Sequence, residues 1–199
     1  MSRFLPSVLS LVLLSSFAVA QNASDLKAPK TWSGERITLP PGFAADMKWR
    51  GVEEIRFAPG MFKPDSESFF SYVFVFELDQ EADLTQQGLQ QELLVYYRGL
   101  AKAVLRGRKV EVKPETFSLQ LKPQPVEGGP QGAKGYVGDL QWLEPFRTQK
   151  PQTLHMDAQA WKAGQKQSLF VCVSPQDKQA EIWKEMYKIR SSYYDGLKK

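Results

Sequence analysis

The chain has 199 residues and a formal net charge of +4 at pH 7, and it contains one cysteine and one histidine. A single cysteine excludes an internal disulfide, and one cysteine with one histidine cannot complete the usual four-ligand zinc site. The small net charge, without long basic runs, argues against an electrostatic surface for nucleic acid.

The first 20 residues have the three-part pattern of a secretory signal peptide. Arg3 supplies the positive charge, residues 8–19 form an apolar run, and small residues precede position 21. The run is shorter than the about 20 apolar residues of a transmembrane helix, which disfavours the alternative of a retained membrane anchor. We expect cleavage between Ala20 and Gln21, which would release a secreted or periplasmic protein that is not held in the membrane.

The chain that follows residues 1–20 has the usual size of one domain. Residues 21–36 are polar and contain a proline and a glycine, which indicates a flexible N-terminal lead-in. Residues 37–199 are predicted to form a single domain. Near its start, residues 39–51 carry prolines and glycines around large apolar side chains, which is typical of an ordered loop.

Two strands are predicted before the first helix. Residues 52–57 are a short candidate that ends at a Pro-Gly pair. Residues 69–78 are the most apolar stretch after the signal peptide, and both faces of a strand formed by them are apolar. Such a strand belongs in the middle of a sheet that is covered on both faces.

A helix follows these strands. Asp83 is a suitable N-cap, and Gln86 three residues later can complete a capping box. Apolar residues recur every three or four positions from Leu89 to Val104, which makes one continuous stripe. Gly107 is expected to end the helix.

Four further strands are predicted after this helix. Residues 116–121 alternate apolar and polar side chains, which indicates a half-buried strand. A loop over residues 122–135, rich in proline and glycine, separates it from a strand that begins at Tyr136. Residues 153–161 and 166–174 are two strands joined by a turn with the sequence KAGQ.

The chain ends in a second predicted helix. Ser174 is its expected cap, Pro175 takes the first helical position, and Asp177 stands where a capping box has its acid. The apolar stripe of this helix runs to Tyr193, and Gly196 is expected to stop it.

The expected order of elements is therefore β-β-α-β-β-β-β-α. Strands joined by short turns pair antiparallel, so we predict an α+β fold, a largely antiparallel sheet of about six strands covered by two helices. This order resembles that of the PsbP-like sandwich domains. No sequence motif accompanies the resemblance, and an analogy of fold does not supply a function.

The cysteine and the histidine lie on the two strands of the predicted hairpin. If Trp161 lies opposite Lys166, then His155 falls directly opposite Cys172, and Asp157 points to the same face because strand side chains alternate. Directly opposed residues have Cβ atoms about 4.5–5.5 Å apart. In this register the three residues would form an activated thiol site.

A second register places different residues together. A bulge at Gly164 would set Leu154 opposite Cys172, and the apolar pattern does not choose between the two registers. A free cysteine beside Phe170 in an apolar strand behaves as a small hydrophobic residue, whereas catalytic cysteines usually have access to solvent. We therefore favour Cys172 as a core residue and keep the thiol site as the alternative.

The sequence contains no motif for a cofactor or a metal. It has no glycine-rich phosphate loop, no Gly-x-Ser-x-Gly turn and no His-Glu-x-x-His helix. Acids at positions 79, 81 and 83 have the spacing that opens a calcium loop, but the required glycine and final glutamate are missing. We predict no metal and no cofactor. Glu53 and Glu54 are adjacent and point to opposite faces of a strand, so a carboxylate pair would need acids that the fold brings together.

Three large aromatic residues, Phe43, Trp49 and Trp142, lie in or near loops and strand ends. Such rings can anchor a partner, but they pack cores as readily, and core packing is the interpretation that we favour. Function concentrates on loops held by a rigid scaffold, so the loops 39–51 and 122–135 are the predicted contact surface.

These features predict an exported, non-catalytic binding domain of the cell envelope or extracellular space, whose partner is a protein or a glycan. The alternative is a small secreted enzyme that uses Cys172, His155 and Asp157, or a pair of carboxylates. The thiol enzyme depends on one geometric point, which is the residue that faces Cys172.

Overall fold

The computed structural model describes residues 26–79, 81–108, 110 and 112–198, which form an antiparallel sheet with a helix on each face. The strands are β1 (Ser33–Leu39), β2 (Gly51–Phe57), β3 (Tyr72–Leu78), β4 (Ser118–Gln124), β5 (Lys134–Leu143), β6 (Pro151–Ala163) and β7 (Lys166–Ser174). The helices are α1 (Gln86–Leu105) and α2 (Glu181–Leu197), with short 3-10 turns at Gly42–Ala44 and Pro114–Thr116. The predicted α+β class is confirmed, with seven strands in the order β-β-β-α-β-β-β-β-α.

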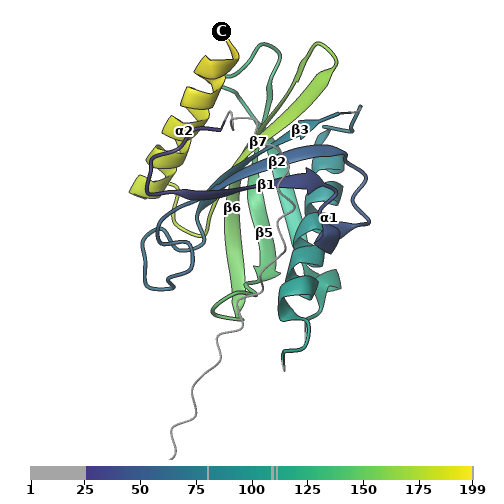
Figure 1. Ribbon diagram of the computed structural model, residues 1–199, viewed down its shortest axis with the longest axis vertical. Coiled ribbons are helices and arrows are strands. Elements are labelled where there is room, and N and C mark those ends of the chain that lie inside the picture. The colour runs from purple at the N-terminus through teal and green to yellow at the C-terminus, as the bar shows by residue number, and fades with distance from the viewer. Residues whose placement is uncertain (1–25, 80, 109, 111, 199) are drawn as a thin grey trace, which may run out of the picture.

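The strands lie in the order β1-β2-β3-β7-β6-β5-β4, and every neighbouring pair is antiparallel. This order places β3 and β7 inside the sheet and β1 and β4 at its edges. Figure 1 shows α1 and α2 on opposite sides of the sheet. The predicted signal peptide, with its cleavage site at Ala20 and Gln21, lies outside the described residues.

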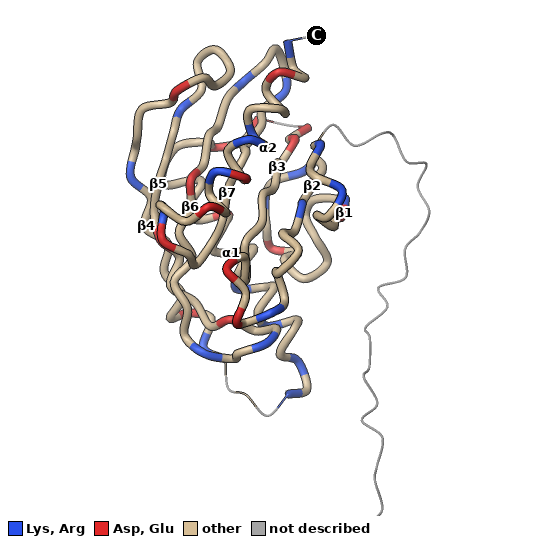
Figure 2. The backbone as a smooth tube through the Cα atoms, turned by 90° about the vertical axis from the view of Figure 1, so that its left-hand side faces the viewer, with Lys and Arg blue, Asp and Glu red and all other residues tan. Residues whose placement is uncertain are grey.

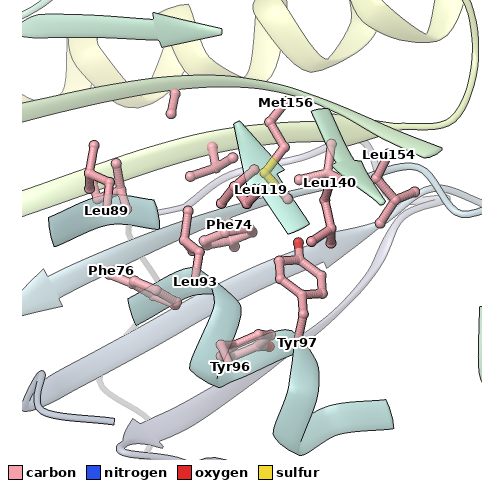
Figure 3. Packing of buried hydrophobic residues seen from close by; sticks show 14 of the residues in the cluster. Phe74, Phe76, Leu89, Leu93, Tyr96, Tyr97, Leu119, Leu140, Leu154 and Met156 are labelled. Carbon is pink, nitrogen blue, oxygen red and sulfur yellow. The ribbon is translucent and has the colours of Figure 1, made fainter. Parts of the chain in front are cut away.

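The side chains of β3 explain its central position. Phe74 and Phe76 point into the core beneath α1, whereas Val73 and Val75 point into the core beneath α2. Figure 3 shows Phe74 and Phe76 packed close to Leu93 of α1. The prediction of a strand covered on both faces is confirmed, because each face of β3 is in contact with a different hydrophobic cluster.

Strand β1 is a strand that the sequence did not predict. Residues 33–36 lie in it, although the polar stretch 21–36 predicted a flexible lead-in, and Leu26 further upstream is buried with 1% of its surface exposed. As an edge strand, β1 pairs with β2 and exposes most of its side chains. It therefore lacks the apolar alternation by which a half-buried strand is recognised.

The first helix begins at Gln86, two residues after the start that an N-cap at Asp83 would give. Thr85 is the N-cap, and its hydroxyl accepts the N–H of Gly88 at 3.2 Å. Asp83 lies outside the helix and accepts the N–H of Thr85 at 2.9 Å. The carboxylate thus stabilises the turn that leads into the helix and does not cap it.

The second helix differs more from the prediction. It begins at Glu181, because Ser174 is still the last residue of β7. The hydroxyl of Ser174 is hydrogen-bonded to that of Ser71 at 2.7 Å and accepts the N–H of Gln176 at 3.0 Å.

The predicted loop 122–135 is shorter than expected, since β4 and β5 extend into both of its ends.

The hairpin between β6 and β7 turns over two residues, Gly164 and Gln165. Gly164 has a φ of +61°, and a glycine at the first central position is typical of a type II′ turn. Ala163 consequently pairs with Lys166. Both predicted registers are wrong, and the pairing is displaced by two positions from the one that set His155 against Cys172.

The edge strand β4 is closed against further strand pairing by side chains of α1. Gln86 donates from its amide to the carbonyl of Leu121 at 2.7 Å, and the side-chain oxygen of Gln90 accepts the Leu121 N–H at 2.8 Å. Arg98 donates to the carbonyl of Phe117 at 2.9 Å. Unpaired backbone groups at a sheet edge promote association with other chains, so α1 protects this edge as well as covering the core.

We predict that Gln90→Ala lowers the free energy of unfolding by about 1–3 kcal/mol, because the buried N–H of Leu121 loses its acceptor. Gln91→Ala, at the next and exposed position of the same helix, is the matched control and should change stability by less than about 0.5 kcal/mol. Urea unfolding of the two variants measures the difference. Equal stabilities would show that the contact does not stabilise the edge.

Candidate functional site

The structure separates the three residues of the predicted thiol site. Asp157, and not His155, lies opposite Cys172, while His155 lies opposite Ser174. The Nδ1 atom of His155 lies 2.6 Å from a carboxylate oxygen of Asp139 on the neighbouring strand β5. The thiol therefore has no imidazole across the hairpin from it, and the geometry that a Cys-His pair requires is not present.

Cys172 lies in the core beneath α2. Its side chain is fully buried, and Val73 lies opposite it on the other neighbouring strand, β3. Burial raises the pKa of the Cys172 thiol to about 12. Since the thiolate is the nucleophilic form, a thiol with this pKa is unreactive near neutral pH.

Asp157 anchors α2 to the sheet. One of its carboxylate oxygens accepts a hydrogen bond from Arg190 at 2.5 Å, and the other accepts one from Tyr187 at 3.1 Å. The guanidinium carbon of Arg190 also lies 4.8 Å from the centre of the Tyr187 ring. The side chains of Asp157 and Arg190 are 9% and 12% exposed, so this ion pair is largely removed from water.

The three aromatic candidates pack into the core beneath α1. Trp49 is buried and lies edge-on to Phe76, with ring centres 5.8 Å apart. Phe43 is half-buried and packs edge-on against Tyr96 at 5.0 Å. Trp142 is buried in the same cluster. These rings stabilise the fold and present little surface to a partner.

The neighbouring acids Glu53 and Glu54 point to opposite faces, as their adjacency predicted. Glu53 is buried beneath α1, where the hydroxyl of Tyr96 donates to its carboxyl group at 3.1 Å. Burial raises the pKa of Glu53 to about 8. Glu54 forms ion pairs with Arg36 and Arg56 on the other face. Within the described parts of the chain, no three residues among His, Cys, Asp and Glu gather closely enough to hold a metal ion.

A polar groove lies on the part of the sheet that α2 leaves uncovered. α2 packs over β3, β7 and β6, and Figure 2 shows β4 and β5 to one side of it. On this face most side chains of the uncovered strands are polar, and together with the β7–α2 turn they line a groove of about 490 Å³. The groove is lined by Ser118, Gln120, Lys122, Val137, Gly138, Asp139, Gln141, His155 and Lys178.

The register of the strands sets the order of the groups in the groove. Gln120, Asp139 and His155 lie side by side on three successive strands. Two residues further along β5, Gln141 lies between Ser118 and Thr153. Its side-chain oxygen accepts a hydrogen bond from the hydroxyl of Thr153 at 2.9 Å. The groove therefore offers amide, hydroxyl, imidazole and carboxylate groups on a rigid backbone.

Lys178 overhangs the groove from the turn between β7 and α2. Its Nζ atom lies 3.3 Å from the centre of the Trp183 ring, which is a cation–π contact. This atom is covered from solvent and has no hydrogen-bond partner among the described residues. Burial lowers the pKa of Lys178 to about 8, although the nearby Asp157 opposes this shift.

A second hollow of about 470 Å³ lies between residues 27–32 and α2. Its lining includes Trp32 and the charged residues Lys27, Glu185 and Lys188. Among the described residues, the buried side-chain nitrogen and oxygen atoms without a hydrogen-bond partner belong to Arg98 and Lys178, and neither residue lines this second hollow. The groove over β4–β6 is therefore the stronger candidate site.

Sequence reasoning missed the groove, although part of its signal was visible. The alternation of residues 116–121 did show that Ser118 and Gln120 share a polar face. That face is polar in any half-solvated strand, so the alternation alone does not distinguish a groove from ordinary surface. Lys178 carried no signal at all, because its place over Trp183 depends on the long turn before α2.

No protein-family model matches the chain, and no curated protein matches it. Among solved structures, the chain is similar to the solution structure of cyanobacterial PsbP (CyanoP) from Synechocystis sp. PCC 6803, with a TM-score of 0.37 and 12% sequence identity over 82% of this chain and 81% of that one. A likeness at this level supports no conclusion about function. In the described part of the chain, neither helix has the length and apolar character needed to cross a membrane.

We predict that Cys172 of the folded protein reacts with a thiol reagent about a hundredfold or more slowly than in the denatured chain, because the thiol becomes accessible only when the structure opens. The reaction rate with Ellman's reagent, with and without urea, measures this. Rapid labelling of the folded protein, with a rate that reaches a plateau near neutral pH, would contradict the burial of the thiol.

A second prediction concerns the buried carboxyl group of Glu53. Its pKa is about 8 in the folded protein and about 4.5 in the unfolded chain, so its contribution to stability is complete below pH 4.5 and is lost as pH rises towards 8. The glutamine of Glu53→Gln does not titrate. Relative to this variant, the free energy of unfolding of the wild-type protein should fall by up to about 1.4 kcal/mol per pH unit in this window. Urea unfolding of both proteins across the window measures the change. A stability difference that does not vary with pH would contradict it.

Proposed function

We propose that the protein is an exported, non-catalytic binding protein, and that the groove over β4, β5 and β6 holds the polar part of a small molecule. The export rests on the signal-peptide pattern of residues 1–20. The binding site rests on one observation, which is that a hollow lined by hydrogen-bonding side chains lies where α2 leaves the sheet uncovered.

The size and the lining of the groove support a small polar ligand. Ligand sites usually enclose about 300–1,000 Å³, and the groove lies within this range. Typical drug-like sites are mostly apolar with a few polar groups, whereas here Val137 is the one aliphatic side chain of the lining. A ligand that replaces water in this groove must therefore supply hydrogen bonds, as a sugar, an amino acid or a hydroxy acid does.

Catalysis by a serine hydrolase is the competing function, because Ser118, His155 and Asp139 all line the groove. Ser118, however, lies on β4, two strands away from His155. It is also two residues along the strand from Gln120, which is the β4 residue level with His155. Standard strand spacings place these two residues about 12 Å apart. A nucleophile and its base must be within about 3 Å, so this arrangement does not form a triad.

The proposal predicts that Gln120→Trp abolishes ligand binding at the groove, because the indole would occupy it from the exposed strand β4. Thr38→Trp is the matched control, since Thr38 is exposed on the same face of the opposite edge strand, β1. The probe set is a panel of monosaccharides, amino acids and hydroxy acids, added to isotope-labelled protein. Amide chemical shifts report which residues respond.

We expect at least one probe to shift the amides of residues 137–141 and 153–155 in the wild-type protein and in Thr38→Trp, but not in Gln120→Trp. Shifts confined to residues 27–32 would move the site to the second hollow. Absence of any response at the groove across the panel would overturn the proposal.

A further inference from the structure

The charged side chains of the groove indicate the charge of its ligand. Two lysines, Lys122 and Lys178, and one acid, Asp139, line it, and the acid is hydrogen-bonded to His155. The lining thus carries an excess of positive charge. We propose that the ligand is a small organic anion and that the ammonium group of Lys178 binds its carboxylate or phosphate. This inference rests on the proposed function and specifies the class of ligand.

The strongest support is the state of the Lys178 ammonium group. It is covered from solvent and has no hydrogen-bond acceptor among the described residues. Nearly all buried polar groups in native proteins are hydrogen-bonded, and an exception commonly marks a functional group or the place of an ion. A buried cation without acceptors costs free energy, and an anionic ligand would supply the acceptors that it lacks.

The acids near Lys178 are already engaged by other residues. Asp157 and Asp139 are the carboxylates that act on Lys178 electrostatically. Arg190 and Tyr187 hydrogen-bond to the two oxygens of Asp157, and His155 holds Asp139. Because neither acid forms an ion pair with Lys178, the positive charge remains for a ligand.

Trp183 holds the lysine at the rim of the groove. The indole is fully buried, and its N–H donates to the carbonyl of Gln176 at 3.0 Å, which fixes the plane of the ring. The ring attracts the ammonium group but offers no hydrogen-bond acceptor, so the three N–H groups are not consumed by this contact. Lysine has a flexible stem, so the ammonium can turn from the ring to an anion in the groove.

The rest of the lining suits the uncharged part of the same ligand. Gln120, Gln141 and Ser118 provide amide and hydroxyl groups on the uncovered strands. Such groups recognise hydroxyl or amide groups, while a lysine recognises a carboxylate or phosphate as a point charge. A sugar acid, a sugar phosphate or a hydroxy acid combines both features.

The test compares three probes of similar size that differ in charge: galacturonate, glucose 6-phosphate and neutral galactose. Each is titrated into the full-length mature protein and followed by the amide shifts of the groove residues 137–141 and 153–155. Lys178→Met keeps the apolar stem over Trp183 and removes the charge. Lys63→Met, at an exposed lysine outside the groove, controls for the loss of one positive charge.

We expect one or both anions to bind at the groove and to lose about 10- to 100-fold in affinity in Lys178→Met, the usual effect of removing a charged hydrogen-bond donor. Lys63→Met should bind them as the wild-type protein does. The ratio between galacturonate and glucose 6-phosphate distinguishes a carboxylate site from a phosphate site. If Lys178→Met does not fold, Lys178→Gln provides a second neutral variant.

Two results would overturn the inference, and they differ from failure of the proposed function. Galactose binding at the groove as tightly as the anions would exclude selection for charge but would leave the groove as a binding site. Anion binding that is unchanged in Lys178→Met would exclude Lys178 as the anchor. If none of the probes shifts the amides of the groove residues, the binding site itself, and with it the proposed function, would be excluded.

Discussion

The burial of β3 and β7 on both faces of the sheet is the constraint on which the rest of the structure depends. Their Phe and Val side chains cannot face water on either side, so each face must be covered. α1 covers one face and α2 the other, and the β3–β7 ladder joins the three strands before α1 to the four strands after it. The two helices therefore complete the burial of the central strands β3 and β7.

This constraint also explains why part of one face stays open. Seven strands spaced about 4.8 Å apart span roughly 29 Å, whereas one helix with its side chains is about 10 Å wide. On the α1 face the loop of residues 40–50 contributes Ala44, Met47 and Trp49 to the covering, and α1 itself reaches the edge strand through Gln86 and Gln90. On the α2 face the chain before β1 packs beside α2 through Leu26 and Trp32. α2 does not extend over β4 and β5 there, so most of their side chains on that face are polar and the groove remains.

The sequence predicted the elements and the fold class because these follow from local alternation and helical periodicity. It did not predict β1, because an exposed edge strand has no apolar pattern. It also did not predict the start of α2, because Ser174 and Pro175 resemble a helix cap but belong to a strand and a turn.

The hairpin register shows a more general reason for failure. Moving the pairing by two positions leaves every side chain on the same face, so the predicted register and the true one have the same pattern of polar and apolar residues. Only the turn decides between them, and the two-residue turn at Gly164-Gln165 places Asp157 opposite Cys172. The predicted thiol site was wrong because of this two-position displacement. The groove was not predicted because it depends on which strands α2 leaves uncovered, and the sequence does not show that.

Lys178 connects the stability of the fold to its proposed role. A lysine that only had to cover Trp183 could be replaced by methionine or leucine, which would pack on the ring without burying a charge that lacks acceptors. The ion pair between Asp157 and Arg190 shows that this face can pair a buried charge when the charge serves to hold α2. The ammonium of Lys178 lies beside that ion pair and is not included in it. Proteins keep such locally unfavourable groups chiefly where function requires them, at some cost in stability. By this reasoning the unpaired ammonium belongs to the proposed site, where a bound anion would offset its cost.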